Sequence, residues 1–270
     1  MRHKRRMRAI LGTFVEIAVN PHPQEDSIIN FAFAEMQLVH DLMSFHDSNS
    51  ELSMLNQNQG RRVSLSKHTH RVLMLAQEMM HKSNGLFNCM VGGALVKRNA
   101  LPQHNPAQAL EQGNVDDLVL DETGATLKRN ALVTLDGIAK GYAVDLAIEA
   151  MQAKGALSGW VNAGGDIRVF GNISLPVQIR NEQQALGEVI QIKNTALATS
   201  SVSAHYDKRF PGLIYHRELT PQIGTWSIIA HKAWLADALT KVASLANAEL
   251  RASIIQSLGG KCLNSANIKI

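Results

Sequence analysis

The sequence predicts an α+β fold, with mixed or antiparallel sheets covered by helices. Stretches that alternate apolar and polar residues, as strands do, occur beside stretches with the 3.6-residue period of helices. Tight turns join neighbouring strands, which is typical of antiparallel pairing. No fixed-period repeat, low-complexity tract or linker divides the chain. We therefore expect one compact domain over residues 9–270, after a basic tail over residues 1–8.

The composition limits the classes of protein to which the chain can belong. Its 270 residues can bury a large core, and 45% apolar with 19% charged residues is typical of soluble globular proteins. No segment approaches the length of a membrane-spanning helix. Cys89 and Cys262 are far apart and form no CxxC pattern, which favours a reducing compartment. The histidines have no metal-ligand spacing, and we expect His68 and His70, near a helix start, to meet solvent.

The formal net charge of +4 is partly concentrated in the first eight residues. Such a run could bind nucleic acid or an anionic membrane surface. A solvated, frayed terminus is the more common arrangement. Since no basic helix or aromatic platform supports nucleic-acid binding, we expect a frayed tail and no nucleic-acid partner.

The first part of the chain is predicted to be mainly helical after one strand. Serine or aspartate before a helical period marks each helix start. The expected elements are a strand at residues 11–19, a helix from Asp26 or Ser27 to about residue 41, a short helix capped by Ser50, an extended piece at 63–65, and a helix from Ser66 to residue 81 that Asn84 and Gly85 end.

The remaining part is predicted to be rich in strands. Asn105 and Pro106 form an N-cap and first helical position, and Gly113 would end that short helix. Three antiparallel strands are expected at residues 115–120, 125–128 and 132–135. Later elements are apolar runs at 160–163 and 167–170, a hairpin at 177–180 and 188–192, an extended piece at 196–199, a strand at 226–230, helices at 234–246 and about 248–258, and a last strand at 261–263.

Residues 131–151 form the stretch around which the chain is organised. A short apolar strand ends at Asp136 and Gly137, and a helix follows that is apolar on most sides and stops at Gly155. Lys140 lies in the first turn of this helix. Free backbone N–H groups, the helix dipole and one ammonium suit an anion. The alternative is an ordinary strand–helix unit with a solvated lysine.

Other loops also combine small residues with one polar side chain, which lets a ligand approach the backbone. A plain turn is the alternative for each of them. A later helix carries one polar stripe, which is either its solvated face or a carboxylate directed at a metal or phosphate. The loops are Asn88 with Gly92 and Gly93, Asn162 with Gly164, Gly165 and Asp166, and Thr199 with Ser200 and Ser201; the stripe is Asp237, Thr240, Lys241 and Ser244.

Seven segments, taken in order, resemble the ApbE family of FAD:protein FMN transferases. They are RRMRAILGTFVEIAV, DSNSELSMLN, GLFNCMVGGALV, LDGIAKGYAVDLAIEAM, WVNAGGDIRVFG, LATSS and LADALTK. The resemblance implies a T-fold-like architecture, bound FAD, and Mg²⁺-dependent transfer of FMN to a threonine of an acceptor flavoprotein, with AMP as the second product. A non-catalytic FAD-binding protein, or a pyrophosphatase that hydrolyses FAD to FMN and AMP, is the alternative function.

The resemblance also implies functional positions. Catalysis would involve Lys140. The family's catalytic histidine is matched by Arg217, so we expect the adjacent His216, whose ordinary pKa suits a general base, to serve instead. The metal would be held by the Gly137 carbonyl, Asp237 and the residues at the two following positions of the stripe, Thr240 and Lys241. The flavin would contact Leu11, Leu86, Phe87, Asn88, Thr134, Lys140 and Leu219.

Several of these positions differ from the family pattern. Asn88 and Thr134 stand where the family has aspartate, and Arg217 stands where it has a histidine. Lys241 replaces a metal-binding threonine, one helical turn after Asp237. We expect its ammonium either to point outward or to contact the FAD pyrophosphate in place of part of the metal's charge. The family's export signal is missing, so we expect a cytoplasmic protein, or a periplasmic one if the start is truncated, with membrane contact only through the acceptor.

Overall fold

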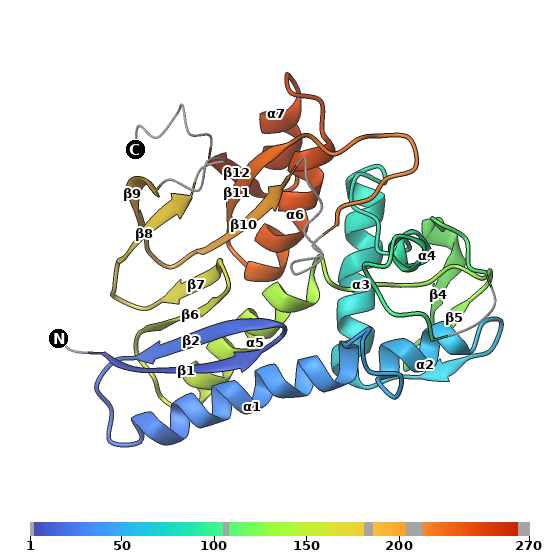
Figure 1. The fold of residues 1–270 in the computed structure, drawn as a ribbon. Coiled ribbons are helices and arrows are strands. Elements are labelled where there is room, and N and C mark those ends of the chain that lie inside the picture. Colours follow the sequence, from blue (N-terminus) through green and yellow to red (C-terminus); the bar gives the residue numbers. More distant parts are fainter. Residues whose placement is uncertain (1–2, 105–107, 181–185, 204–212, 264–270) are drawn as a thin grey trace. The chain divides into compact units, whose positions relative to one another are not determined.

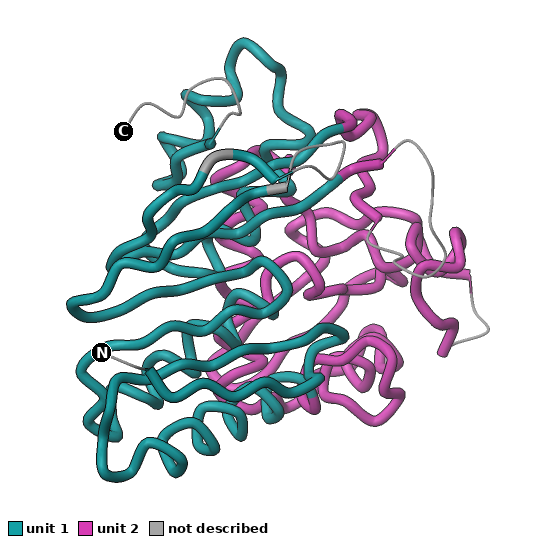
Figure 2. The backbone as a smooth tube through the Cα atoms, turned by 60° about the vertical axis from the view of Figure 1, so that its left-hand side comes forward, with its two compact units in different colours: residues 1–40, 140–201, 224–270 teal, residues 41–139, 202–223 magenta. Residues whose placement is uncertain are grey.

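The computed structural model describes residues 3–104, 108–180, 186–203 and 213–263. The chain divides into two compact units, coloured separately in Figure 2. Unit 1 comprises residues 1–40, 140–201 and 224–270, and unit 2 comprises residues 41–139 and 202–223. The prediction of one domain over residues 9–270 stays a prediction.

Unit 1 is built on a seven-stranded sheet (Figure 1). The pairs β1–β2, β2–β6, β6–β7, β7–β10 and β11–β12 are antiparallel. In sheet order the strands are β1 (Lys4–Ile10), β2 (Thr13–Val19), β6 (Gly159–Ala163), β7 (Asp166–Phe170), β10 (Ala196–Val202), β11 (Gly224–Ala230) and β12 (Gly260–Leu263).

The two faces of this sheet are covered differently. Strand side chains alternate between faces, so on β7 Ile167 and Val169 face the hairpin of β8 (Leu175–Arg180) and β9 (Leu186–Ile192). Arg168, between them, points the other way and pairs with a carboxylate of a helix. The helices of unit 1 are α1 (Glu25–Met43), which continues into unit 2, α5 (Ala139–Ala153), α6 (Ala233–Leu245), which packs on β11, and α7 (Arg251–Ser257).

The frayed terminus expected for residues 1–8 is wrong for Lys4–Arg8, because these residues belong to β1. Every residue of β1 pairs with β2, from Lys4 opposite Val19 to Ile10 opposite Thr13. Arg6 also forms an ion pair of 2.7 Å with Asp26 of α1. The expected solvation is nevertheless found, since most of this strand is exposed.

Unit 2 contains a small sheet in the order β3 (Val63–Ser64), β5 (Gly124–Leu127) and β4 (Leu118–Leu120). Two predicted helix caps are confirmed there. Ser50 accepts a hydrogen bond from the Ser53 N–H at 3.0 Å, and Ser66 accepts one from the Thr69 N–H at 3.4 Å. The helices of unit 2 are α2 (Glu51–Gln57), α3 (Lys67–Lys82) and α4 (Gly92–Lys97), with a 3₁₀ turn η1 (Val115–Asp117) before β4.

The strand predicted at residues 132–135 is wrong, although Val133 and Leu135 are buried as expected. The backbone groups of this segment find other partners. Asn56 makes two 2.8 Å hydrogen bonds to the N–H and carbonyl of Val133 through its side-chain amide, and the Thr134 N–H donates to the Cys89 carbonyl at 2.8 Å. A side chain and a neighbouring loop therefore replace the strand partner.

Three further expectations concern loops and helix starts of unit 2. The N-cap predicted at Asn105 and Pro106 lies outside the described residues, and residues 108–113 form no helix. His68 is buried rather than solvated. Gly92 and Gly93 open α4 because that helix packs on backbone, since a Cβ at Gly93 would come within 2.0 Å of the Leu110 carbonyl oxygen.

Candidate functional site

The start of α5 brings Lys140 and the backbone of α6 together within unit 1. Gly141 lies in the first turn, and a Cβ atom there would come within 2.4 Å of the Ala233 carbonyl oxygen. Glycine therefore allows the two backbones to meet. The Gly141 N–H donates to Oδ2 of Asp237, on α6, at 3.2 Å. The predicted helix start and the predicted polar stripe thus meet through a direct hydrogen bond.

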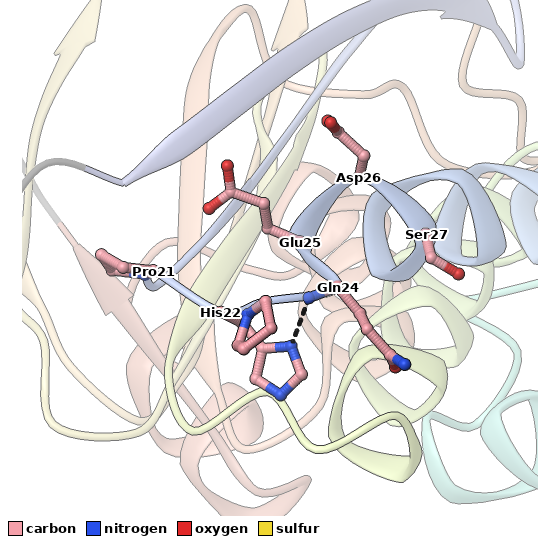
Figure 3. A pocket seen from close by; sticks show the side chains of 7 residues that line it. Pro21, His22, Gln24, Glu25, Asp26 and Ser27 are labelled. Carbon is pink, nitrogen blue, oxygen red and sulfur yellow. Dashed lines mark hydrogen bonds between the residues drawn. The ribbon is translucent and has the colours of Figure 1, made fainter.

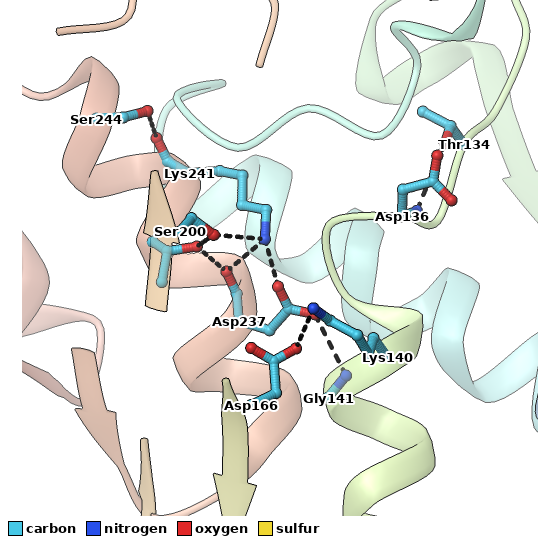
Figure 4. Close-up of polar contacts among 10 residues, drawn as sticks. Thr134, Asp136, Lys140, Gly141, Asp166, Ser200, Asp237, Lys241 and Ser244 are labelled. Atoms are coloured by element: carbon cyan, nitrogen blue, oxygen red, sulfur yellow. Dashed lines mark hydrogen bonds and ion pairs between the residues drawn. The ribbon is translucent and has the colours of Figure 1, made fainter. Parts of the chain in front are cut away.

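Asp237 and Lys241 form an ion pair along α6 (Figure 4). Asp237 is buried, and the Lys241 side chain is 20% exposed. The Lys241 ammonium contacts Oδ1 of Asp237, and it also donates to the Asp237 carbonyl oxygen at 3.2 Å and to Oγ of Ser200, on β10, at 3.4 Å. Ser200 is fixed in turn by Thr240, at 2.8 Å between the hydroxyl oxygens. Three oxygens therefore surround this ammonium.

Asp166, the first residue of β7, completes the group. Its side chain is 2% exposed, and its Oδ2 meets the Lys140 ammonium at 3.1 Å as an ion pair without regular hydrogen-bond geometry. Burial, the largest cause, and the Asp237 carboxylate together raise the pKa of Asp166 to about 6, although the ammonium groups of Lys140 and Lys241 lower it. The four side chains therefore influence one another's charge.

We call Lys140, Asp166, Asp237 and Lys241 the four-charge cluster. Figure 4 shows their charged ends directed toward one another. Two carboxylates and two ammonium groups give a formal charge of zero, which is how buried charges are tolerated. Both lysines keep some exposure, 30% for Lys140 and 20% for Lys241. The cluster can therefore offer positive charge, beside the N-terminus of α5, to an anion such as a phosphate.

Asp145 joins the two helices that carry the cluster. It lies on α5 and accepts hydrogen bonds from the N–H groups of Ala233 at 3.1 Å and Trp234 at 3.0 Å, at the start of α6. It also forms an ion pair with Arg168 of β7. Burial raises the pKa of Asp145, while Arg168 and the two N–H groups act in the opposite direction. A buried carboxylate therefore takes the place of a side-chain cap on α6.

The predicted flavin contacts lie in both units. Leu11, in unit 1, is at the tip of the β1–β2 hairpin with a left-handed φ of 58°. In unit 2, the side chain of Asn88 is held by two backbone groups, because its amide accepts from the Met90 N–H at 2.7 Å and donates to the Gly113 carbonyl at 3.2 Å. Leu86 and the buried Phe87 precede it in the same loop. Their contact with a flavin stays a prediction.

The turn before α5 carries two more predicted positions, both in unit 2. Thr134 donates a hydrogen bond from its hydroxyl to Oδ2 of Asp136 at 3.0 Å. Gly137 follows in the turn, and the part predicted for its carbonyl in a metal site stays a prediction. The metal positions predicted on α6, namely Asp237, Thr240 and Lys241, are brought together in unit 1.

The segment that carries His216 and Leu219 is attached to residues 111 and 112 of the same unit. Arg217 donates through its backbone N–H and its guanidinium to Gln112, at 2.8 and 2.7 Å. His216 accepts hydrogen bonds at Nδ1 from the N–H groups of Glu218 and Leu219, both at 3.1 Å. Burial lowers the pKa of His216. The neutral ring therefore carries its proton on Nε2, where it is a donor.

This geometry favours a structural role for His216 over the predicted general base. We expect His216→Ala to slow cleavage of FAD by less than about threefold, whereas loss of a general base costs roughly 10²-fold or more. His216→Asn, which keeps an acceptor for the two N–H groups, is the matched variant. A loss near 10²-fold in both variants, measured as AMP release at several pH values, would confirm the predicted general base.

A surface pocket at the start of α1 offers no comparable chemistry (Figure 3). Its lining, residues 21–27, comes from one continuous segment. His22 accepts at Nδ1 from the Gln24 N–H at 3.1 Å, and Asp26 is paired with Arg6. The four-charge cluster, by contrast, collects side chains from α5, β7 and α6.

Sequence reasoning did not connect Asp166 or Asp145 with Lys140 and the polar stripe of α6. Asp166 was noted only as a polar group beside Gly164 and Gly165, which form the two-residue turn of the β6–β7 hairpin with φ angles of 60° and 104°. A charged residue directly after such a turn and before the apolar run at residues 167–170 is the signal that could have identified it. Asp145 offered a similar signal, because a charged residue on a mostly apolar helix indicates a buried partner.

Comparison with known proteins identifies the family. The profile of the ApbE family matches residues 11–263. The chain belongs to the ApbE family. It is similar to proteins named FAD:protein FMN transferase from Vibrio cholerae (27% identical over 207 residues, 70% of this chain and 62% of that protein) and Haemophilus influenzae (29% over 237 residues, 79% and 66%). The chain thus spans just under two thirds of the length of these relatives.

Solved structures confirm the expected fold. The ApbE protein of Thermotoga maritima matches with a TM-score of 0.82 at 21% identity, covering 96% of this chain and 93% of that one. The flavin transferase ApbE of Vibrio cholerae matches with a TM-score of 0.79 at 18% identity, covering 97% and 96%. The α+β architecture of ApbE proteins is therefore confirmed. Among the described residues, no helix is both long and apolar enough to cross a membrane.

Proposed function

We propose that the chain is an FAD:protein FMN transferase that moves FMN from FAD to a threonine hydroxyl of an acceptor flavoprotein. The observation that carries this proposal is the four-charge cluster, which presents two partly exposed ammonium groups beside the N-terminus of α5 in a member of the ApbE family. FAD contains a pyrophosphate with two negative charges. Ammonium groups and helix N-termini are the protein groups that bind such a ligand.

In the proposed reaction, the threonine oxygen forms a bond to the phosphorus of the FMN half. The bond from that phosphorus to the bridging oxygen breaks, and the bridging oxygen leaves with AMP. The hydroxyl proton passes to solvent. Phosphoryl transfer requires mainly positioning and charge neutralisation. Lys140 would bind the phosphates, while Asp166 orients its ammonium through the 3.1 Å ion pair.

The cluster does not fit a magnesium ion as the side chains lie. Both oxygens of Asp237 are engaged, one by Lys241 and the other by the Gly141 N–H. No group of three or more acidic, histidine or cysteine side chains that could hold a metal gathers among the residues that the structure describes. A divalent ion here would also lie close to two ammonium groups, which is unfavourable at short range. We therefore assign no step to a metal.

The experiment that tests the proposal follows both products. The purified protein is incubated with FAD and an acceptor flavoprotein domain, with the same domain carrying Thr→Ala at the acceptor position as the control. We expect covalent flavin fluorescence on the unmodified acceptor alone and one AMP released per labelled acceptor. AMP without labelling would support the pyrophosphatase alternative, and bound, intact FAD would support the binding protein. No FAD uptake at all would contradict all three functions.

A further inference from the structure

We propose that the Lys241 ammonium is a built-in cation at Asp237, so that this site takes up no divalent ion while Lys241 is present. The inference rests on the proposed function only where it names FAD as the ligand. Lys241 follows Asp237 by one helical turn, and its ammonium lies against three oxygens: Oδ1 and the carbonyl of Asp237 and the hydroxyl of Ser200.

The surroundings show that these oxygens form a built site. Asp237 is 1% exposed, and Thr240, which is fully buried, holds both the Asp237 carbonyl and the Ser200 hydroxyl in place, at 2.7 and 2.8 Å. Oxygen atoms from carboxylate, carbonyl and hydroxyl groups are also the ligands that a magnesium ion prefers. The ammonium therefore occupies a position with the chemistry of a cation site.

Asp166 adds a second buried carboxylate to the four-charge cluster. Its buried Oδ2 meets Lys140 only as an ion pair and accepts no regular hydrogen bond among the described residues. With Lys241 removed, the two carboxylates would face Lys140 alone, and the cluster would carry a net charge of −1. A divalent cation would then be attracted, because the ammonium that now repels it is gone.

The consequence for ligand binding is a changed dependence on metal. A lysine is a mobile point charge that suits phosphate. Lys241 would supply part of the positive charge that a phosphate ligand needs, without a bound ion. FAD affinity should therefore change by less than about twofold between excess EDTA and excess magnesium. In Lys241→Thr, which adds a hydroxyl ligand, the FAD affinity measured in EDTA should be at least about tenfold lower than that of the unmodified protein, because one positive charge near the phosphates is lost.

The decisive test uses the protein and Mn²⁺ alone. We expect no Mn²⁺ binding to the unmodified protein at submillimolar concentrations, measured by electron paramagnetic resonance of free Mn²⁺. Lys241→Thr should bind one Mn²⁺, and its melting temperature should rise by at least about 3 °C on addition of the ion. Asp237→Asn combined with Lys241→Thr should bind none. Lys232→Met is the matched control, because it removes an ammonium that pairs with Glu149 outside the cluster.

Each outcome decides the inference separately from the proposed function. Submillimolar Mn²⁺ binding to the unmodified protein that Asp237→Asn abolishes would overturn the inference and leave FMN transfer untouched. Failure of Lys241→Thr to gain a site would also overturn it. Lys241→Met, which keeps the volume of the side chain, replaces the threonine variant if that one does not fold. If Lys241→Thr gains the Mn²⁺ site while the unmodified protein transfers no FMN, the inference would be supported and the proposed function contradicted.

Discussion

Replacing Lys140 with methionine should lower the rate of AMP release from FAD by about 10²- to 10³-fold, the usual cost of removing one donor that stabilises developing negative charge. Lys140 lies in the first turn of α5, where the helix dipole adds positive charge. Methionine keeps most of the side-chain volume but has no N–H group. The loss should therefore appear in kcat/KM for FAD, measured by chromatography of AMP.

This substitution also leaves Asp166 buried without its ion pair. The loss of folding stability therefore has to be separated from the loss of catalytic activity. In the double variant Lys140→Met with Asp166→Asn, both charges are gone and the free energy of unfolding should largely recover. Activity should stay low, because the phosphate still lacks its ammonium. Lys154→Met, just after the end of α5 and with its ammonium 4.3 Å from the centre of the Phe31 ring, is the matched control. Recovery of activity in the double variant would show that Lys140 acts only through stability.

The position and the end of α5 could be predicted closely from the sequence, because the residues that decide them lie within or next to the helix. Gly155 ends the helix with a left-handed φ of 88°, as expected from its position after the apolar period. The caps at Ser50 and Ser66 were predictable for the same reason, since a cap and its N–H partner are three residues apart. The stripe on α6 was also visible as a spacing, although its two interpretations were left open.

Long-range partners decided the features that could not be predicted. Residues 132–135 have the composition of a strand, but their hydrogen bonds go to Asn56 and to a loop. The basic residues of β1 gave no sign that β2 would pair with them along its whole length. Asp166 was part of a candidate loop in the sequence, but its ion pair with Lys140, 26 positions earlier in the chain, became visible only when β7 placed the two side chains together. Contacts of this kind have no signature in the spacing of a single sequence.

Replacing Asp145 with alanine should lower the free energy of unfolding by about 3–5 kcal/mol, which is typical for removal of one partner from a buried ion pair. Two effects act together. Arg168, whose side chain is 16% exposed, would lose its carboxylate, and the N–H groups of Ala233 and Trp234 would lose their acceptor. Because these N–H groups begin α6, the variant should also disturb Asp237 and Lys241. Denaturant unfolding measures the stability change.

A matched variant on the same helix separates burial from charge. Glu149 also pairs with a residue at the start of α6, Lys232, at 2.7 Å, but its side chain is 53% exposed. Exposed ion pairs contribute little, so Glu149→Ala should cost less than about 1 kcal/mol. Adding Arg168→Met to Asp145→Ala should recover part of the loss, because no unpaired charge is then buried, while the two N–H groups still lack an acceptor. Equal costs for Asp145→Ala and Glu149→Ala would contradict the buried connection between α5, α6 and β7.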